Sequence, residues 1–226
     1  MSAEKLSILR GLEEVPIDGL LDKKVSLIGY GNQGRAHALN LRDSGINIVI
    51  ATRSTKNATN DDFEVVTMAE ASNADLVIIA LPDELQAKIY TEQIHPNLNP
   101  NAVLGFIHGF SIHYGHIEPP ESNGVVMVAP KGPGVTVRQR YQKGTGVPAL
   151  LAVEKENTTN TAKSIALGWA AGIGSGRTVV IESTFAAETE TDIFGEQAII
   201  VGGLAALILA AFETLVSAGY PPELSY

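Results

Sequence analysis

Gly29-Tyr30-Gly31-Asn32-Gln33-Gly34 is the stretch of sequence that decides the fold. The apolar run 25–28 precedes it, and a helix-compatible segment follows it to about Asp43. A G-x-G-x-x-G pattern between a strand and a helix is typical of a dinucleotide-binding unit, in which the backbone of the turn approaches a pyrophosphate at the helix N-terminus. We therefore expect these six residues to bind a dinucleotide; the alternative is a tight structural turn without a ligand.

Short apolar runs alternate with longer amphipathic segments on both sides of this turn. The expected strands are Val25–Ile28, Ile46–Ala51, Asp75–Leu81, Ala102–Ile107, Val125–Val128, Ala149–Val153 and Thr178–Ile181. The expected helices are Gln33–Asp43, Asp83–Gln93 and Thr158–Ala171. Strands and helices that alternate in this way favour an α/β fold with a Rossmann-like, doubly wound and mostly parallel sheet.

The strand pattern ends after Ile181, and residues 185–218 are compatible only with helix. We expect an NADP-binding Rossmann domain at residues 1–182 and the start of an all-α C-terminal domain at 183–226. The second part has too few residues for a core of its own. Its apolar stretch 198–212 has 15 residues and two glycines, Gly202 and Gly203. Because a membrane span needs about 20 residues, we expect a core or interface helix, covered by another copy in a dimer or larger homo-oligomer, and no membrane partner.

The composition of the 226 residues narrows the class of function. Sixteen basic and 25 acidic residues give a net charge of −9, which argues against nucleic-acid binding. The absence of cysteine excludes disulfides, thiolate metal ligands and thiol catalysis. With no signal peptide apparent at the N-terminus, we expect a cytoplasmic protein with a small-molecule substrate.

The end of the second expected strand indicates the choice of cofactor. A site that prefers NAD places an acidic residue there to bind the ribose 2′-hydroxyl. This sequence has Arg53, Ser54, Thr55 and Lys56 in what we interpret as a loop. Guanidinium, hydroxyl and ammonium donors suit a 2′-phosphate, so the segment predicts NADPH. The alternative is a solvated, positively charged loop.

Two further strand ends are expected to border the cofactor. Leu81-Pro82-Asp83-Glu84-Leu85-Gln86 follows the third strand, and we expect it to contact the cofactor while Asp83 and Gln86 form a helix capping box. His108, in Phe106-Ile107-His108-Gly109-Phe110, follows the next strand. An imidazole at that position can act as an acid, a base or an organiser of ligands, although a structural role is the alternative.

Lys131 lies in the unusual segment Ala129-Pro130-Lys131-Gly132-Pro133-Gly134. The prolines restrict the backbone and the glycines permit close approach. A lysine held in this way can bind a carboxylate or stabilise an oxyanion. A rigid turn with an exposed lysine is the alternative.

The acidic segment Glu188-Thr189-Glu190-Thr191-Asp192-Ile193-Phe194-Gly195-Glu196-Gln197 is the strongest candidate for chemistry. On a helix, Glu188, Asp192 and Glu196 share one face, where like charges repel. We therefore expect a positive partner nearby, and oxygen ligands without cysteine favour Mg²⁺ or Mn²⁺. An acidic helix start that complements the macrodipole is the alternative.

These motifs together resemble the ketol-acid reductoisomerase family, in which they occur in this order. The pattern Gly144-x-Gly146-Val147-Pro148-Ala149 and the segment 212–215 also match, so the resemblance runs from about Asp22 to Tyr226. It implies Mg²⁺-dependent alkyl migration in a 2-acetolactate-type substrate, followed by reduction with NADPH to a dihydroxy acid, in the synthesis of valine and isoleucine. The metals serve as Lewis acids and as a template.

The resemblance also implies roles for single residues. Asp192 and Glu196 would bind the metal, of which a complete site holds two ions, and His108, Lys131 and Gly134 would serve catalysis. The implied cofactor contacts are Gly29 to Gly34, Arg53 to Lys56, Leu81 to Gln86, His108 and Gly134.

Members of the family continue with helices that carry further glutamate ligands and a substrate-binding serine, whereas this sequence ends at Tyr226. We therefore expect this chain to bind NADPH but to have little reductoisomerase activity. One rival is an NADP-dependent hydroxy-acid dehydrogenase without magnesium, which gives no reason for Asp192 and Glu196 on one helix face. The other is a non-catalytic dinucleotide-binding module.

Overall fold

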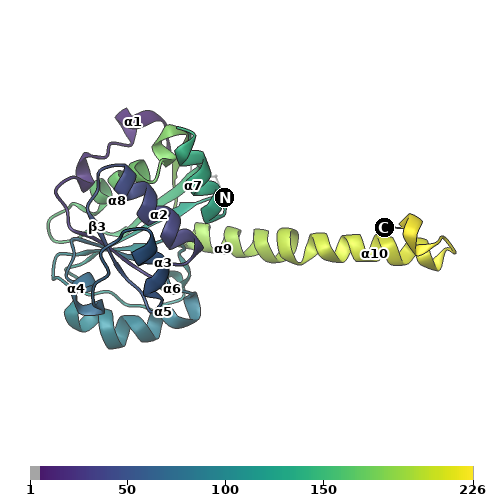
Figure 1. Cartoon of the computed structure of the whole chain (residues 1–226), viewed down its shortest axis with the longest axis horizontal. Helices are drawn as coiled ribbons and strands as arrows, with labels where there is room; N and C mark the ends of the chain where they lie inside the picture. The colour runs from purple at the N-terminus through teal and green to yellow at the C-terminus, as the bar shows by residue number, and fades with distance from the viewer. Residues whose placement is uncertain (1–5, 226) are drawn as a thin grey trace. The chain divides into compact units, whose positions relative to one another are not determined.

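The computed structural model describes residues 6–225 and divides into two compact units (Figure 1). The first unit is Met1–Ala186, described from residue 6, and the second is Ala187–Tyr226, described to residue 225. Each unit has its own architecture.

A sheet forms the centre of the first unit. Over the described residues it has eight strands in the order β1-β8-β7-β6-β5-β4-β2-β3. The strands are β1 Ile8–Leu9, β2 Val25–Ile28, β3 Ile48–Ala51, β4 Leu76–Ile79, β5 Val103–Phe106, β6 Gly124–Pro130, β7 Ala149–Lys155 and β8 Val180–Glu182. Strands β3, β2, β4, β5 and β6 are parallel neighbours, β7 is antiparallel to β6, and β1 is antiparallel to β8. The sheet is thus mostly parallel, as the sequence predicted.

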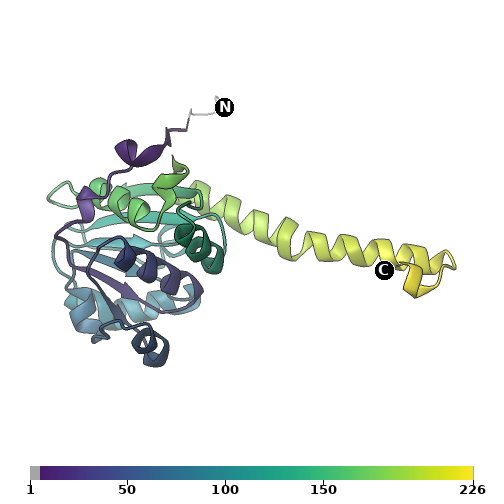
Figure 2. The same cartoon turned by 45° about the horizontal axis from the view of Figure 1, so that its top comes forward.

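Helices cover both faces of the sheet (Figure 2). Every residue of β2 and β4 is buried, because alternate side chains enter different cores. Leu27 packs with α2 (Asn32–Asp43) and α8 (Ala162–Gly172) on one face. Its neighbour Ile28 belongs to the other face, with α4 (Met68–Ser72). A doubly wound sheet explains why the sequence of these strands is continuously apolar.

Further short elements connect the strands. They are the helices α1 Gly11–Glu14, α3 Thr55–Asn60, α5 Asp83–Ile89, α6 Phe110–His113 and α7 Gly134–Gln142, the 3-10 turns Asp18–Leu20, His95–Asn97 and Ser175–Arg177, and the π-helical segment Tyr90–Ile94. The seven expected strands are all present with ends shifted by a few residues. Strand β1 and the helices α1, α3, α4, α6 and α7 were not predicted from the sequence, and α8 begins at Ala162 instead of at the expected Thr158. The expected loop Ser54–Lys56 is wrong in part, because α3 begins at Thr55.

The second unit is helical. Helix α9, Phe185–Gly195, leads into it and continues as a π-helical segment, Glu196–Val201, then as α10, Gly203–Ser217, and α11, Pro222–Ser225. Gly202 and Gly203 lie within this long helix. A Cβ on Gly203 would lie 1.9 Å from the carbonyl oxygen of Ala198, so the glycine is what permits the wider π turn at this point.

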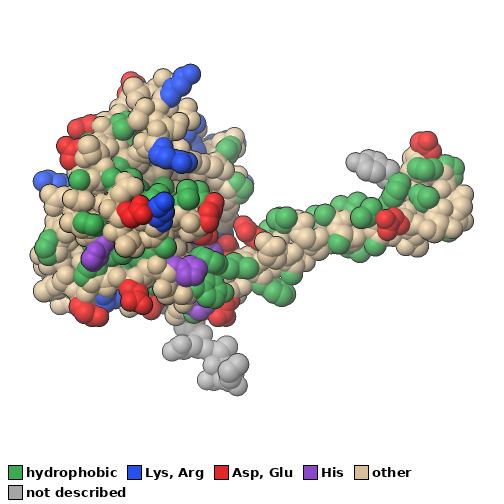
Figure 3. All heavy atoms as spheres, turned by 90° about the horizontal axis from the view of Figure 1, so that it is seen from below, with side chains coloured by type: hydrophobic (Ala, Val, Ile, Leu, Met, Phe, Trp, Pro, Cys, Tyr) green, Lys and Arg blue, Asp and Glu red, His purple; other side chains and the backbone are tan. Residues whose placement is uncertain are grey.

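The long helix therefore exceeds the apolar stretch measured in the sequence. From Phe185 to Ser217 it has 33 residues, and it is long and apolar enough to cross a membrane by length and composition alone. The expectation that it is too short to span is wrong, because flanking residues extend the helix at both ends. Hydrophobic side chains such as Leu204, Leu207 and Ile208 are exposed along α10 (Figure 3).

Candidate functional site: a nucleotide pocket and an acidic helix face

A pocket of about 530 Å³ lies at the carboxyl ends of β2 and β4. The chain leaves β2 in one direction toward β3 and returns to form β4 on the other side of β2. This change of direction is the topological switch point at which doubly wound sheets bind ligands. The predicted cofactor residues that line the pocket are Gly29, Tyr30, Gly31, Asn32, Gln33, Gly34, Arg53, Ser54, Leu81, Pro82, Asp83, Leu85, Gln86 and His108.

Gly29 makes the tight turn at the end of β2. Its φ is +100°, a left-handed conformation that side chains rarely adopt. A Cβ at this position would also lie 2.5 Å from the carbonyl oxygen of Ala80, in the chain that leaves β4. The absence of a side chain therefore lets the two strand ends converge on the pocket.

Gly31 and Gly34 have different surroundings in the glycine turn. A Cβ on Gly31 would meet no described atom within 4 Å, so its backbone is open to an incoming group. A Cβ on Gly34 would lie 2.4 Å from the carbonyl oxygen of Gly29, so helix and turn pack closely there. Helix α2 has Gly31 as its N-cap, and no described side chain caps it. Its first N–H groups are suited to a phosphate.

Tyr30 is fixed by a polar cluster beside the turn. Its hydroxyl donates to Asp61 across 2.9 Å, and the guanidinium of Arg35 binds both carboxylate oxygens of Asp61, at 2.6 and 2.8 Å. The hydrogen bond from Arg35 is the main cause that lowers the pKa of Asp61. Burial, followed by the bond to Asp61, raises the pKa of the Tyr30 phenol. The cluster holds α3 against the turn while Tyr30 stays neutral.

The segment after β4 forms another wall. Helix α5 begins at Asp83, and its N-cap is Pro82. The prediction that Asp83 and Gln86 form a capping box is therefore wrong. Instead the side-chain nitrogen of Gln86 donates to the carbonyl of Leu81 and to the carboxylate of Asp83, both at 2.9 Å. Glu84, which was predicted to contact the cofactor, is not among the residues that line the described pocket.

The structure separates the four residues expected at the cofactor 2′ position. Arg53 and Ser54 line the pocket, whereas Thr55 and Lys56 begin α3 outside its described lining. The residues Ala51, Thr52, Met68, Ile79, Ala80, Ile89 and Ile107 also line it and were not predicted. Most of these are apolar and belong to strands or helices, so their sequence signal is that of a core residue.

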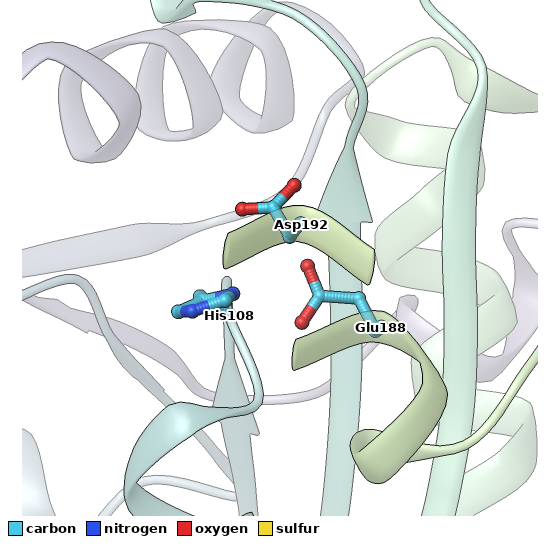
Figure 4. A group of neighbouring side chains, drawn as sticks. All are labelled: His108, Glu188 and Asp192. Atoms are coloured by element: carbon cyan, nitrogen blue, oxygen red, sulfur yellow. The ribbon is translucent and has the colours of Figure 1, made fainter. Parts of the chain in front are cut away.

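His108 follows the end of β5 (Figure 4). It lines the pocket and is half-buried. Its ring stacks near that of Phe110, with centroids 6.4 Å apart and an angle of 21° between the planes. The strand end therefore brings an imidazole to the same pocket as the glycine turn, as parallel-strand topology predicts.

Lys131 and Gly134 lie beside the glycine turn but outside the described lining of the pocket. The backbone N–H of Lys131 donates to the carbonyl of Pro148 across 2.8 Å. A Cβ on Gly134 would lie 2.2 Å from the backbone oxygen of Asn32. The close approach expected of Gly134 is therefore an approach to the glycine turn itself.

The acidic residues of α9 lie in the second unit. Glu188 and Asp192 are one turn apart, and a carboxylate oxygen of each lies within 4.8 Å of the other (Figure 4). Glu188 is 1% exposed, which makes the repulsion between the two charges more costly than at the surface. Glu196, expected on the same face, is exposed and begins the π-helical segment. Glu188, which was not among the predicted metal ligands, is therefore the acidic residue that lies near Asp192.

Family models match most of the chain. The acetohydroxy acid isomeroreductase NADPH-binding domain matches residues 19–179, and the ketol-acid reductoisomerase C-terminal domain matches residues 185–226. The first match includes the whole pocket, and the second includes the acidic residues of α9. The residues between the two matches include Ser183, where the sequence predicts a domain boundary.

Solved structures are similar over nearly the whole chain. An NADH-preferring ketol-acid reductoisomerase from an uncultured archaeon is 43% identical, with a TM-score of 0.90, over 97% of this chain and 69% of that one. A semialdehyde dehydrogenase NAD-binding protein from Cupriavidus necator, in complex with calcium and NAD, is 22% identical, with a TM-score of 0.73, over 91% of this chain and 78% of that one. Pyrroline carboxylate reductase from Plasmodium falciparum, with NADP bound, is 20% identical, with a TM-score of 0.56, over 90% of this chain and 73% of that one.

The two more distant structures show the shared fold only. The family models and the 43% identical structure go further, because they match both the nucleotide-binding unit and the helical unit. The chain belongs to the ketol-acid reductoisomerase family, whose members are oxidoreductases with a nicotinamide cofactor.

Proposed function

We propose that the site formed by this chain takes 2-acetolactate-type ketol acids, NADPH and Mg²⁺, and that the product of the family reaction is a 2,3-dihydroxy acid. In this proposal an alkyl group migrates to the neighbouring carbon, and the new 2-keto acid is reduced. Such products are precursors of valine and isoleucine, and we place the reaction in the cytoplasm. The proposal extends the family membership to a cofactor, a metal and single residues.

NADPH is the proposed hydride donor. The pocket fits a dinucleotide, because Gly31 leaves its backbone open and the N-terminus of α2 has no described side-chain cap. Arg53 and Ser54 line the same pocket and offer donors to a 2′-phosphate. The similar archaeal reductoisomerase is NADH-preferring, so the preference in this chain rests on its own residues at 53–56.

Three residues outside the glycine turn have proposed roles with the substrate. His108, at the pocket, would hold or move a proton at an imidazole nitrogen. The ammonium of Lys131 would bind a carboxylate or an oxyanion. Gly134 would keep the start of α7 close enough to the turn for Lys131 to stay in place.

Asp192 and Glu196 are the proposed ligands of Mg²⁺. We propose Glu188 as a third ligand, because its carboxylate lies close to that of Asp192. The carboxylates of Glu188 and Asp192 fit a divalent cation, because they offer oxygen ligands that lie within 4.8 Å of each other. When bound, Mg²⁺ supplies Lewis-acid polarisation of the substrate oxygens. The acidic residues themselves would hold the ion and leave positions for substrate.

The Glu188–Asp192 pair is the observation that carries the proposal. The rival, a magnesium-free dehydrogenase for hydroxy acids, uses the same nucleotide fold but has no need of these carboxylates. A titration of the NADPH-loaded chain with 2-acetolactate, in Mg²⁺ and in a chelator, separates the two. We expect heat of binding only with Mg²⁺. Equal binding of the ketol acid in the chelator would contradict the proposal and favour the dehydrogenase.

We also propose that a second copy of the chain covers the apolar face of α10. Isolated exposed side chains are common, but a continuous apolar surface along a helix indicates an interface. Ile208→Glu should lower the mass measured by light scattering, whereas Val135→Glu, at an exposed position of the first unit, should leave it unchanged. A monomeric wild-type chain in detergent-free buffer would contradict this assembly.

A further inference from the structure

The side chain of Gln33 connects the cofactor turn to the segment that carries Lys131. Its amide nitrogen donates to the carbonyl oxygen of Gly132 across 2.9 Å, although the two residues are 99 positions apart in the chain. The orientation of the amide follows from this contact, because the reverse orientation would place two oxygens against each other. A residue of the nucleotide pocket therefore reaches the neighbour of Lys131 directly.

The side-chain oxygen of Gln33 shows that the bond to Gly132 has an energetic cost. The side-chain oxygen of Gln33 is buried and accepts no hydrogen bond from the described residues. Leaving such an oxygen unpaired costs about 1–3 kcal/mol. An apolar side chain of the same length would avoid this cost but would lose the bond to Gly132. Gln33 therefore makes the hydrogen bond to Gly132 although its own side-chain oxygen is left without a described donor.

The helices that follow the two segments are also joined along their length. Gly134, at the start of α7, packs on the backbone of Asn32 at the start of α2. One turn or more further on, Arg138 donates to the side-chain oxygen of Asn40 at 2.8 Å and pairs with Asp43 at 2.7 Å. The two helices are therefore held side by side, and the Gln33 bond ties their pocket ends.

We propose that Gln33 is a positioning residue, which makes the placement of Lys131 depend on the nucleotide bound at the glycine turn. The inference rests on the proposed function, in which the turn binds NADPH and Lys131 meets the substrate. Binding at the backbone of the turn fixes Gln33, and its amide then fixes the carbonyl of Gly132, one residue from Lys131. The cofactor and the lysine are thereby aligned before the substrate arrives.

Acetylation of lysines, read by peptide mass spectrometry with and without saturating NADPH, tests the proposal on the full chain. Lys131 is exposed and can be labelled. Lys155, whose ammonium donates to the carbonyls of Pro119 and Pro120, is an internal reference. In the wild type we expect NADPH to change the labelling rate of Lys131 about fivefold. This factor is at the lower end of the coupling that is typical between two sites of one protein.

Gln33→Met removes the donor, and Gln33→Glu keeps the shape but places a carboxylate against the carbonyl. In both variants the Lys131 rate should no longer respond to NADPH at concentrations that saturate the variant by fluorescence titration. The matched control is Gln139→Met, at an exposed position of α7 outside the described lining of the pocket. This control should keep the response.

A response that persists in both Gln33 variants overturns the inference, because it would come from direct shielding by the cofactor. Wild-type chain that binds NADPH without any change at Lys131 also overturns it and leaves the proposed function standing. Failure of the wild type to bind NADPH in the titration contradicts the proposed function first, and the inference with it.

Discussion

The indole N–H of Trp169 donates a hydrogen bond to Nδ1 of His37 across 3.0 Å, and both side chains are completely buried. His37 belongs to α2, whose N-terminus forms the glycine turn, and Trp169 belongs to α8. Because Nδ1 accepts, the proton of the neutral ring is on Nε2, which has no described partner. Burial lowers the pKa of His37 to about 3, so the imidazole is neutral in the folded chain.

This buried imidazole predicts a loss of stability in weak acid. In the unfolded chain His37 takes up a proton near its ordinary pKa of about 6.5. Between that pH and the folded pKa of about 3, the unfolded state binds more protons, so the free energy of unfolding falls as the pH falls. We expect this group to remove about 1–2 kcal/mol between pH 6.5 and 5. Urea unfolding at both pH values measures it.

His37→Asn provides the comparison, because its oxygen can accept from Trp169 without titrating. The variant should be less stable than the wild type at pH 7 and should show a smaller loss between pH 6.5 and 5. An identical dependence on pH in both proteins would mean that His37 is not the source.

Gly31→Ala should separate nucleotide binding from folding. The backbone of Gly31 has φ −84° and ψ −160°, which alanine adopts, and its Cβ would meet no described atom within 4 Å. The thermal midpoint should therefore stay close to that of the wild type. The methyl group would occupy the path of the pyrophosphate, so NADPH affinity should fall about tenfold or more, equal to about 1.4 kcal/mol. Fluorescence titration and a thermal melt give the two values.

The matched variant is Gly34→Ala, whose Cβ would lie 2.4 Å from the carbonyl oxygen of Gly29. It should destabilise the fold by about 1–3 kcal/mol through overpacking. If Gly31→Ala bound NADPH as tightly as the wild type, the cofactor would not approach this turn.

Arg53→Ala should weaken NADPH more than NADH. A hydrogen bond to a charged group contributes about 1.5–3 kcal/mol, so the affinity for NADPH should fall by about tenfold or more. NADH lacks the 2′-phosphate and should lose little, which makes it the internal control. Equal losses for both cofactors would show that Arg53 contacts a part that they share.

The sequence predicted those parts of the fold that depend on local pattern. The strands β2 and β4 are continuously apolar because both faces are buried, and the glycine turn stands between a strand and a helix. Helix α7 was missed because its segment, Gly134–Gln142, begins with Gly-Val-Thr-Val and has little apolar periodicity. Its place is set by contacts with α2, such as Arg138 with Asn40, which no local pattern reveals.

The candidate site was predictable to a similar degree. Motif residues at strand ends, such as Gly29 and His108, line one pocket because parallel strands share an edge. The side-chain bond between Gln33 and Gly132 joins positions 99 residues apart, so only the structure gives it. The spacing rule for an α-helix placed Glu196 with Asp192, but it contained no sign of the π turn that starts at Glu196.

Manganese titration followed by electron paramagnetic resonance tests the central claim most directly, because free Mn²⁺ loses its signal when carboxylates bind it in place of Mg²⁺. Glu188 and Asp192 are the acidic pair in question, and Glu190→Gln, on an exposed position of the same helix, is the control. We predict that the wild type and Glu190→Gln bind Mn²⁺ and that Mg²⁺ competes. Asp192→Asn should bind about tenfold more weakly or worse, because a carboxylate ligand is lost. Equal Mn²⁺ affinity in Asp192→Asn and in the wild type would contradict a metal-dependent reaction at this helix.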